Sequence, residues 1–210
     1  YQFDDRPKKL KIGFVSGDFR QHPVGFFLLD ILKHLKNENL ELIAYSNSKE
    51  KDDLSIKLKS HFVNWHEIEK QDDLKIINQI RKDRIHILFD LSGHTAKNRL
   101  PIFINKPAPI QVSWAGYNGS TGIPEIDYLI GDPIVTPASE NNYYTEKIFP
   151  LPNIWVCFTP PNFEVKLSQL PIIENRYITF GCFNNLSKIN DKVISLWSRI
   201  LKAIPKSKIF

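Results

Sequence analysis

The chain has 210 residues, 42% of them hydrophobic, a formal net charge of +5 and 14 Phe residues, enough apolar side chains for one globular domain and part of another. It has no stretch of 18 apolar residues, no secretory leader and no run of five like charges, so we expect no membrane and no nucleic acid as partner. The two cysteines lack a CxxC spacing, which excludes a disulfide framework and a thiolate zinc site and favours a cytoplasmic protein.

Strand and helix patterns alternate along the first two thirds of the chain. Alternation at this spacing predicts right-handed crossovers and an α/β fold, a Rossmann-like, doubly wound, mostly parallel sheet. The expected strands are Lys11–Val15, Leu40–Tyr45, Phe62–Trp65, Ile85–Leu91, Ile110–Trp114 and Tyr128–Ile130. The expected helices are Val24–Leu35, Asp53–Ser60, Gln71–Lys82 and a shorter Lys97–Ile104.

The pattern changes after residue 150. Residues 151–175 contain four prolines without periodicity and predict an irregular linker between an N-terminal Rossmann-like subdomain, 9–150, and a second subdomain that begins at 176. That second part should hold a strand over Tyr177–Phe183, a helix over Asp191–Ile204 and the opening of a further strand at residue 208. We therefore expect a fragment of a longer protein, with the second subdomain truncated at residue 210.

An acid and an imidazole follow the first expected strand. The segment KIGFVSGDFRQHPVGFF places Asp18 and His22 on the loop that leaves Lys11–Val15. Open α/β sheets bind ligands at the carboxyl ends of their strands, which makes both residues candidates for chemistry. The structural alternative is that Asp18 caps the turn and His22 is a solvated loop residue.

Two later segments carry further candidates. The loop WAGYNGSTG follows Ile110–Trp114, and its three glycines permit close backbone approach, although it can also be read as a flexible surface loop. The segment FNNLSKIND places Lys188 just before the helix that starts near Asp191. A helix N-terminus with a lysine beside it suits a diphosphate, whereas the plain reading is an exposed lysine.

Four segments, taken together and in order, resemble one enzyme family. They are GDFRQHPVG, ILFDLSGHTAKNRLPIF, KPAPIQVSWAGYNGSTGIPEIDYLIGD and ITFGCFNNLSKINDKVISLWSRILKAIP. In content and spacing they resemble the catalytic region of the O-GlcNAc transferase and SPINDLY family, glycosyltransferase family 41, from about Lys9 to the last residue. GHTAKNRL and FNNLSKI are more similar to the SPINDLY-like branch than to the animal enzymes.

The resemblance implies the N-terminal half of a GT-B glycosyltransferase plus the start of its second Rossmann-like domain. The implied reaction is inverting, metal-independent transfer of a sugar, GlcNAc from UDP-GlcNAc or fucose from GDP-fucose, to Ser or Thr hydroxyls of an acceptor protein. No cofactor and no metal are implied, and the sequence has no DxD motif. The family also implies upstream tetratricopeptide (TPR) repeats in the full-length protein, and we expect the chain alone to be inactive.

The family's functional residues carry over by position. The implied catalytic residues are Asp18 as orienter or proton relay, His22 at the reacting centre and Lys188 on the departing diphosphate. The implied substrate- and donor-binding residues are His94, Thr95, Gly116, Tyr117 and Asn185. Ser187 stands where the animal enzymes have Tyr, and Asn118 where most relatives have Pro.

Two other functional classes stay open from the residues. One is a different GT-B sugar-nucleotide enzyme, such as an epimerase, whose ribose-binding acids would lie beyond residue 210. The other is a non-catalytic binding module with a Rossmann shell, which would need none of Asp18, His22 and Lys188.

Overall fold

The computed structural model describes residues 7–35, 39–160 and 163–210. The chain divides into two compact units, residues 1–161 and 162–210, which are described separately below. Among the described residues, no helix has both the length and the apolar character needed to cross a membrane.

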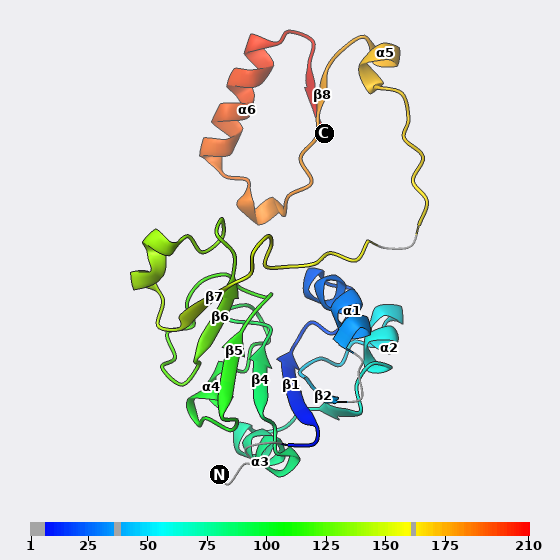
Figure 1. The fold of residues 1–210 in the computed structure, drawn as a ribbon. Coiled ribbons are helices and arrows are strands. Elements are labelled where there is room, and N and C mark those ends of the chain that lie inside the picture. Colours follow the sequence, from blue (N-terminus) through cyan, green and yellow to red (C-terminus); the bar gives the residue numbers. More distant parts are fainter. Residues whose placement is uncertain (1–6, 36–38, 161–162) are drawn as a thin grey trace. The chain divides into compact units, whose positions relative to one another are not determined.

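Seven parallel strands form the sheet of the first unit, in the order β3-β2-β1-β4-β5-β6-β7 (Figure 1). The strands are β1 Leu10–Ser16, β2 Leu40–Ser46, β3 Asn64–Glu67, β4 Ile87–Asp90, β5 Ile110–Ser113, β6 Tyr128–Gly131 and β7 Lys147–Pro150. The helices are α1 Pro23–Leu35, α2 Asp53–Lys59, α3 Asp73–Asp83 and α4 Leu100–Ile104, with a 3₁₀ turn η1 at Ala138–Tyr143. The expected doubly wound, Rossmann-like parallel sheet is confirmed.

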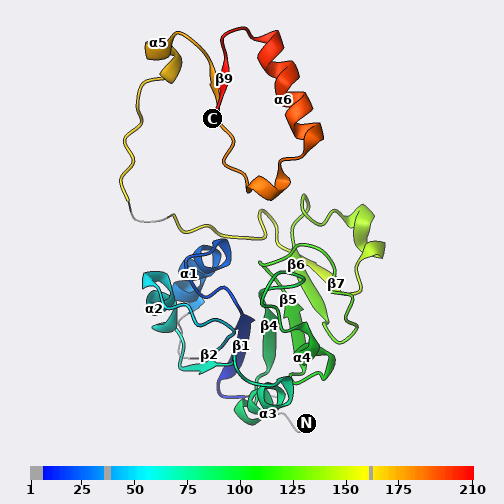
Figure 2. The same ribbon diagram turned by 180° about the vertical axis from the view of Figure 1, so that it is seen from behind.

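Successive side chains of each strand point to opposite sides of the sheet, and in the central strands both sides are buried. Ile12 and Phe14 of β1 pack in one cluster with α1 and α2, which lie side by side (Figures 1 and 2). Val15 of β1 and Tyr45 of β2 pack in the other cluster with α3 and α4. The central strands β1 and β2 therefore end in unbroken runs of buried residues rather than in an alternation.

The strand order places a topological switch point between β1 and β4. From β1 the chain builds the sheet outward to β3, and then returns to add β4 to β7 on the other side of β1. At such a point the loops at the carboxyl ends of the two central strands diverge and leave a crevice for a ligand. In this sheet the loops after β1 and β4 stand at that position.

The helix ends follow local chemistry. Asp52 caps α2 in a reciprocal capping box with Ser55, and Asp72 caps α3 by accepting from the N–H of Lys75. The expected helix from Lys97 begins only at Leu100, because Lys97 has a left-handed φ of 60° that no helix accommodates.

Two strands differ from expectation. The expected strand Phe62–Trp65 lies two residues later, at Asn64–Glu67, because Phe62 still belongs to the turn that ends α2 and its side chain packs into the core. Strand β7 was not expected, since it lies at the sheet edge and its exposed residues lack the apolar alternation of a half-buried strand.

The second unit contains α5 Pro171–Asn175, β8 Thr179–Phe180, the 3₁₀ turn η2 Leu186–Lys188, α6 Asp191–Ala203 and β9 Lys208–Ile209. Strands β8 and β9 pair in parallel, so this unit is a strand–helix–strand crossover. The expected irregular segment 151–175 ends in α5, and the strand expected over Tyr177–Phe183 is shorter. Ile194 and Ile200 of α6 are 50% and 39% exposed.

Candidate functional site

The loop after β1 holds a buried carboxylate. The side chain of Ser16, the last residue of β1, accepts the Asp18 N–H at 2.9 Å, which turns the chain at the strand end. Asp18 is 4% exposed, its Oδ1 accepts from Arg20 at 3.2 Å and its Oδ2 lies 3.7 Å from Nδ1 of His22. Because 3.7 Å exceeds a hydrogen bond, Asp18 acts on the imidazole mainly through its charge.

His22 is held as a neutral ring. The backbone N–H of Val24 donates to its Nδ1 at 3.3 Å, which leaves the proton of the neutral ring on Nε2. Partial burial lowers the pKa of His22 below 6.5; the Asp18 carboxylate opposes this shift, and the charges of Arg20 and Lys97 add to it. At neutral pH the ring is therefore uncharged and able to take up a proton.

An ion-pair network joins the loops after β1, β2 and β4. Glu50, in the loop after β2, accepts from Arg20 at 2.9 Å and from Lys97 at 3.0 Å. Asn47, in the same loop, donates from its side chain to the carbonyl of Lys97 at 2.8 Å. The network fixes both cations near His22, and Arg20 is thereby engaged within the protein.

The loop after β4 is folded around a buried acid, Asp90. Its carboxylate accepts from the N–H groups of Ser92 and Gly93 at 3.1 and 2.8 Å. The exposed His94 that follows donates from Nε2 to the carbonyl of Thr121 at 3.0 Å. The Thr95 hydroxyl donates to the carbonyl of Ser92 at 2.8 Å, so its proton serves this turn while its oxygen can still accept a hydrogen bond.

Asp90 should make folding stability depend on pH. Complete burial raises its pKa from 3.8 to about 6, so between these values the folded chain holds a proton that the unfolded chain releases. Stability contributed by this proton is present below pH 4 and is lost as pH rises to 7. We therefore expect the free energy of unfolding of the wild type, measured with urea, to fall by about 3 kcal/mol over this pH range relative to that of Asp90→Asn. Parallel pH curves for the two proteins would contradict the assignment.

The loop after β5 approaches the end of β4 closely. A Cβ on Gly116 would collide with the carbonyl oxygen of Leu91, so the close approach requires glycine there. The left-handed backbone of this loop is instead at Ala115, with φ 67°, and at Gly122, with φ 71°. Tyr117 is 41% exposed and sets its ring edge-on to His94, with 5.6 Å between the ring centroids.

The rest of this loop is tethered rather than free. Glu146, only 4% exposed, accepts from the Ser120 hydroxyl and the Thr121 N–H, both at 2.8 Å, and from the Thr121 hydroxyl. Because His94 is bonded to the Thr121 carbonyl, Glu146 also fixes the partner of that imidazole. These hydrogen bonds argue against a flexible surface loop, the alternative that the sequence left open.

We expect Gly116→Ala to destabilise the chain by about 2 to 3 kcal/mol, since the added methyl meets backbone that cannot rotate away. Urea unfolding at fixed pH measures the change. Asn118→Ala, at an exposed position of the same loop, is the matched control and should shift the midpoint little. Equal effects of the two substitutions would show that the loop can move away from β4.

The second unit carries Lys188 and Asn185. The Asn185 side chain accepts the Ser187 N–H at 3.0 Å and so starts the turn η2, on which Lys188 is exposed. The N-terminus of α6 is capped by Asn190, which accepts from the N–H groups of Lys192 and Val193. Two of the free N–H groups expected to face an anion are thus already bonded within the chain.

Six of the eight expected site residues therefore follow adjacent parallel strands at one edge of one sheet: Asp18, His22, His94, Thr95, Gly116 and Tyr117. Lys188 and Asn185 lie in the other unit. The sequence reading missed Glu50, Asp90 and Glu146; only Asp90 had a signal, an acid at the end of an apolar strand. In the described ranges, no group of three or more His, Cys, Asp or Glu side chains is arranged to hold a metal ion.

The sequence model of glycosyl transferase family 41 matches residues 1–163. The chain belongs to this family. It is 38% identical over 209 residues to the probable UDP-N-acetylglucosamine–peptide N-acetylglucosaminyltransferase SPINDLY of Hordeum vulgare, and 34% identical over 216 residues to the corresponding probable enzyme SEC of Arabidopsis thaliana. These alignments cover 98% and 97% of the chain, and each covers 22% of the relative.

A solved structure of a mutant O-GlcNAc transferase from Thermobaculum terrenum superposes with a TM-score of 0.87 at 34% identity. It covers 96% of this family 41 chain and 38% of the solved chain. The expected fold class, the N-terminal half of a GT-B glycosyltransferase with the start of a second Rossmann-like domain, is confirmed by this match. The chain spans about a fifth of the length of the curated relatives.

Proposed function

We propose that the protein to which this chain belongs is a protein O-glycosyltransferase. It moves a sugar from a nucleotide diphosphate to Ser or Thr hydroxyls, with inversion at the anomeric carbon. The observation that carries the proposal is the similarity, over 98% of the chain, to a relative named as a UDP-N-acetylglucosamine–peptide transferase. That name makes GlcNAc the preferred donor sugar and GDP-fucose the alternative to be tested.

His22 takes the proton of the acceptor hydroxyl in this proposal. Its lowered pKa keeps the ring neutral at pH 7, which a base requires. In the structure Nδ1 accepts from the Val24 N–H and the ring proton is on Nε2, so Nε2 can serve as the base only in the other tautomer. In that tautomer the bond from Val24 is given up, and the ring proton is on Nδ1, which lies 3.7 Å from Oδ2 of Asp18. Asp18 then stabilises the imidazolium, because a carboxylate favours the charged ring.

The diphosphate that leaves with growing negative charge is assigned to Lys188 and Asn185. An ammonium group supplies the charge that a divalent ion supplies in other transferases, which is the basis for a metal-independent reaction. The Asn185 amide nitrogen has two N–H donors for phosphate oxygens while its oxygen holds η2.

The remaining expected residues form the wall of the site. Tyr117 and His94 are exposed neighbours that can contact donor or acceptor, and Gly116 and Thr95 shape the loops that carry them. Both loops are anchored by buried carboxylates, so they hold a bound substrate in one position, which favours reaction by proximity. We further propose a cytoplasmic protein with TPR repeats that bind the acceptor.

The test is transfer by the longer protein with UDP-GlcNAc or GDP-fucose and a Ser-containing peptide, followed by mass spectrometry. A peptide that gains one sugar supports the proposal, and NMR of the product gives the anomeric configuration. EDTA should leave the rate unchanged. A donor that is epimerised or hydrolysed while the peptide stays unmodified would contradict protein glycosylation.

A further inference from the structure

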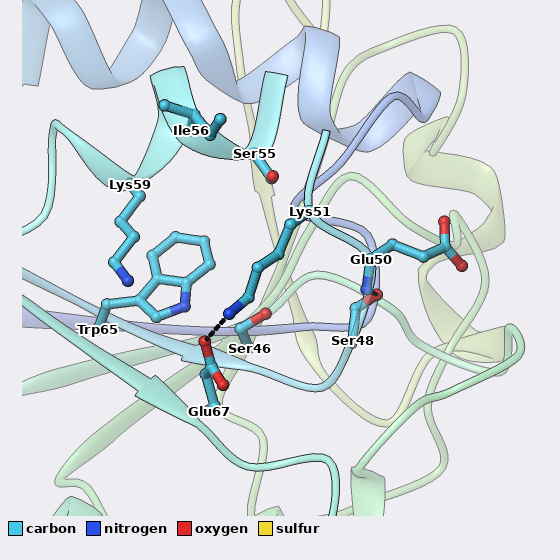
Figure 3. A pocket seen from close by; sticks show the side chains of 9 residues that line it. All are labelled: Ser46, Ser48, Glu50, Lys51, Ser55, Ile56, Lys59, Trp65 and Glu67. Carbon is cyan, nitrogen blue, oxygen red and sulfur yellow. Dashed lines mark hydrogen bonds and ion pairs between the residues drawn. The ribbon is translucent and has the colours of Figure 1, made fainter. Parts of the chain in front are cut away.

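A separate groove lies at the carboxyl ends of β2 and β3, two strands away from β4. One cavity of about 180 Å³ is bordered by Ser46 and Trp65 (Figure 3). A second, of about 320 Å³, extends toward Lys70 and shares Ser48, Lys51 and Glu67 with the first. The shared residues make the two cavities neighbouring parts of one groove.

Two hydrogen-bond donors in this groove have no partner among the described residues. Ser46 is only 3% exposed, and its hydroxyl is in none of the hydrogen bonds of that part of the chain. The indole Nε1 of Trp65 likewise bonds to no described residue. Figure 3 shows both atoms directed to the same space as the Lys51 ammonium group. Neither atom belongs to the fully buried polar atoms that lack a partner, so both stay open to the groove and can donate to an acceptor of a ligand.

The indole is held rigidly in this position. Its ring packs against Phe19 and Phe62, with centroid distances of 5.2 and 5.6 Å, and the Lys59 ammonium lies 5.8 Å from its centroid. The Lys59 ammonium thus lies over the ring, and the groove offers the N–H edge of the indole as a donor. A donor that is already ordered loses little entropy when a ligand binds.

The charges along the groove leave a positive excess. Glu69 pairs with Lys49 at 3.1 Å and Glu67 with Lys51 at 3.3 Å, whereas Glu50 is engaged by Arg20 and Lys97. Lys59 and Lys70 line the two ends and pair with no carboxylate in the described part of the chain. The groove thus presents two unneutralised ammonium groups in addition to two free donors.

We infer that this groove binds an acidic segment of the acceptor polypeptide. One carboxylate is seated on the Ser46 hydroxyl and the Trp65 N–H, and further acids lie near Lys59 and Lys70. A peptide fits better than a phosphate, because Glu67 and Glu69 repel a concentrated dianion while acids spaced along a chain can meet each lysine in turn. Glu50 links the groove to Arg20 beside Asp18, so a peptide bound here lies next to the candidate site. The inference rests on the proposed function for the identity of its ligand.

The binding test needs no turnover. The chain, labelled with ¹⁵N, has four tryptophans whose indole N–H signals can be followed by NMR, and Trp65→Phe identifies one of them. We expect that signal to shift saturably with a capped peptide of Asp, Glu and Ser, and not with the same peptide carrying Asn and Gln. Lys59→Gln with Lys70→Gln should weaken binding about tenfold or more.

The matched control removes the same charge elsewhere. Lys33→Gln with Lys82→Gln, on exposed positions of α1 and α3, should leave the affinity within about twofold, because screened distant charges contribute little. An unmoved Trp65 signal, or equal weakening by the two pairs, would overturn the inference. Inorganic phosphate that shifts Trp65 at the peptide's concentration would overturn the assignment to a peptide.

A second measurement separates this inference from the proposed function. In the longer protein, Lys59→Gln with Lys70→Gln should raise KM for an acidic acceptor about tenfold with little change in kcat, since the groove binds but does not react. If the variant transfers the sugar with an unchanged KM for the acidic acceptor, the groove does not bind the acceptor, while the proposed function is unaffected. If the peptide binds at Trp65 but no sugar nucleotide serves as a donor for transfer, the proposed function is wrong, while peptide binding by the groove is unaffected.

Discussion

Replacing His22 by alanine should lower turnover of the longer protein by about 10²- to 10⁴-fold, the usual contribution of a general base. The rate of the wild type should be full above the pKa of His22 and should fall as pH drops through it, because the protonated ring cannot accept a proton. Since burial and two cations lower that pKa below 6.5, the acid limb should lie below pH 6.5. Peptide glycosylation measured as kcat/KM against pH gives the profile.

Two neighbouring substitutions predict opposite shifts of this limb. Asp18→Asn removes the charge that raises the pKa of His22, so the limb should move to lower pH while the rate near pH 7 falls. Arg20→Gln removes a charge that lowers it, so the limb should move to higher pH. His34→Ala, an exposed imidazole at the end of α1, is the control and should change neither rate nor profile. If the acid limb of the pH profile stays in place with both substitutions, His22 is not the general base.

Lys188→Ala should lower turnover by about 10²-fold with a smaller change in donor KM, because its charge acts mainly on the departing diphosphate in the transition state. Lys188→Arg should restore little, since a planar guanidinium does not replace a compact ammonium on the short turn η2. Steady-state kinetics with a fixed acceptor peptide separate kcat from donor KM.

Lys192→Ala is the matched control for this prediction. Lys192 is exposed in the first turn of α6, only four residues from Lys188, but it is not one of the positions to which a functional residue of the family was assigned. Its loss should change kcat by less than about twofold, as expected for a solvated charge. If Lys192→Ala and Lys188→Ala raise donor KM equally and leave kcat intact, Lys188 acts only in ground-state attraction of the donor.

The central strands and most helices were predictable from sequence, because their signals are local. The apolar run of β1, the spacing of α1 and the caps of α2 each depend on residues within one element. The first and last residues of a strand were less predictable where pairing with a neighbouring strand decides them. Strand β3 begins at Asn64 rather than Phe62, since the register with β2 aligns Asn64 with Ile43.

The chain order of strands, loops and motifs by itself determined that Asp18, His22, His94 and Gly116 follow parallel strands, and hence that they share one sheet edge. The tertiary structure alone determined what acts on them. Glu50 reaches Arg20 and Lys97 across 30 and 47 residues, and Glu146 holds Thr121 across 25. The pKa of Asp90, and with it the charge of this side chain, depends on its burial, which no local sequence pattern predicts. Burial and long-range pairing depend on how separate elements pack, so the protonation of the site could be read only from the folded chain.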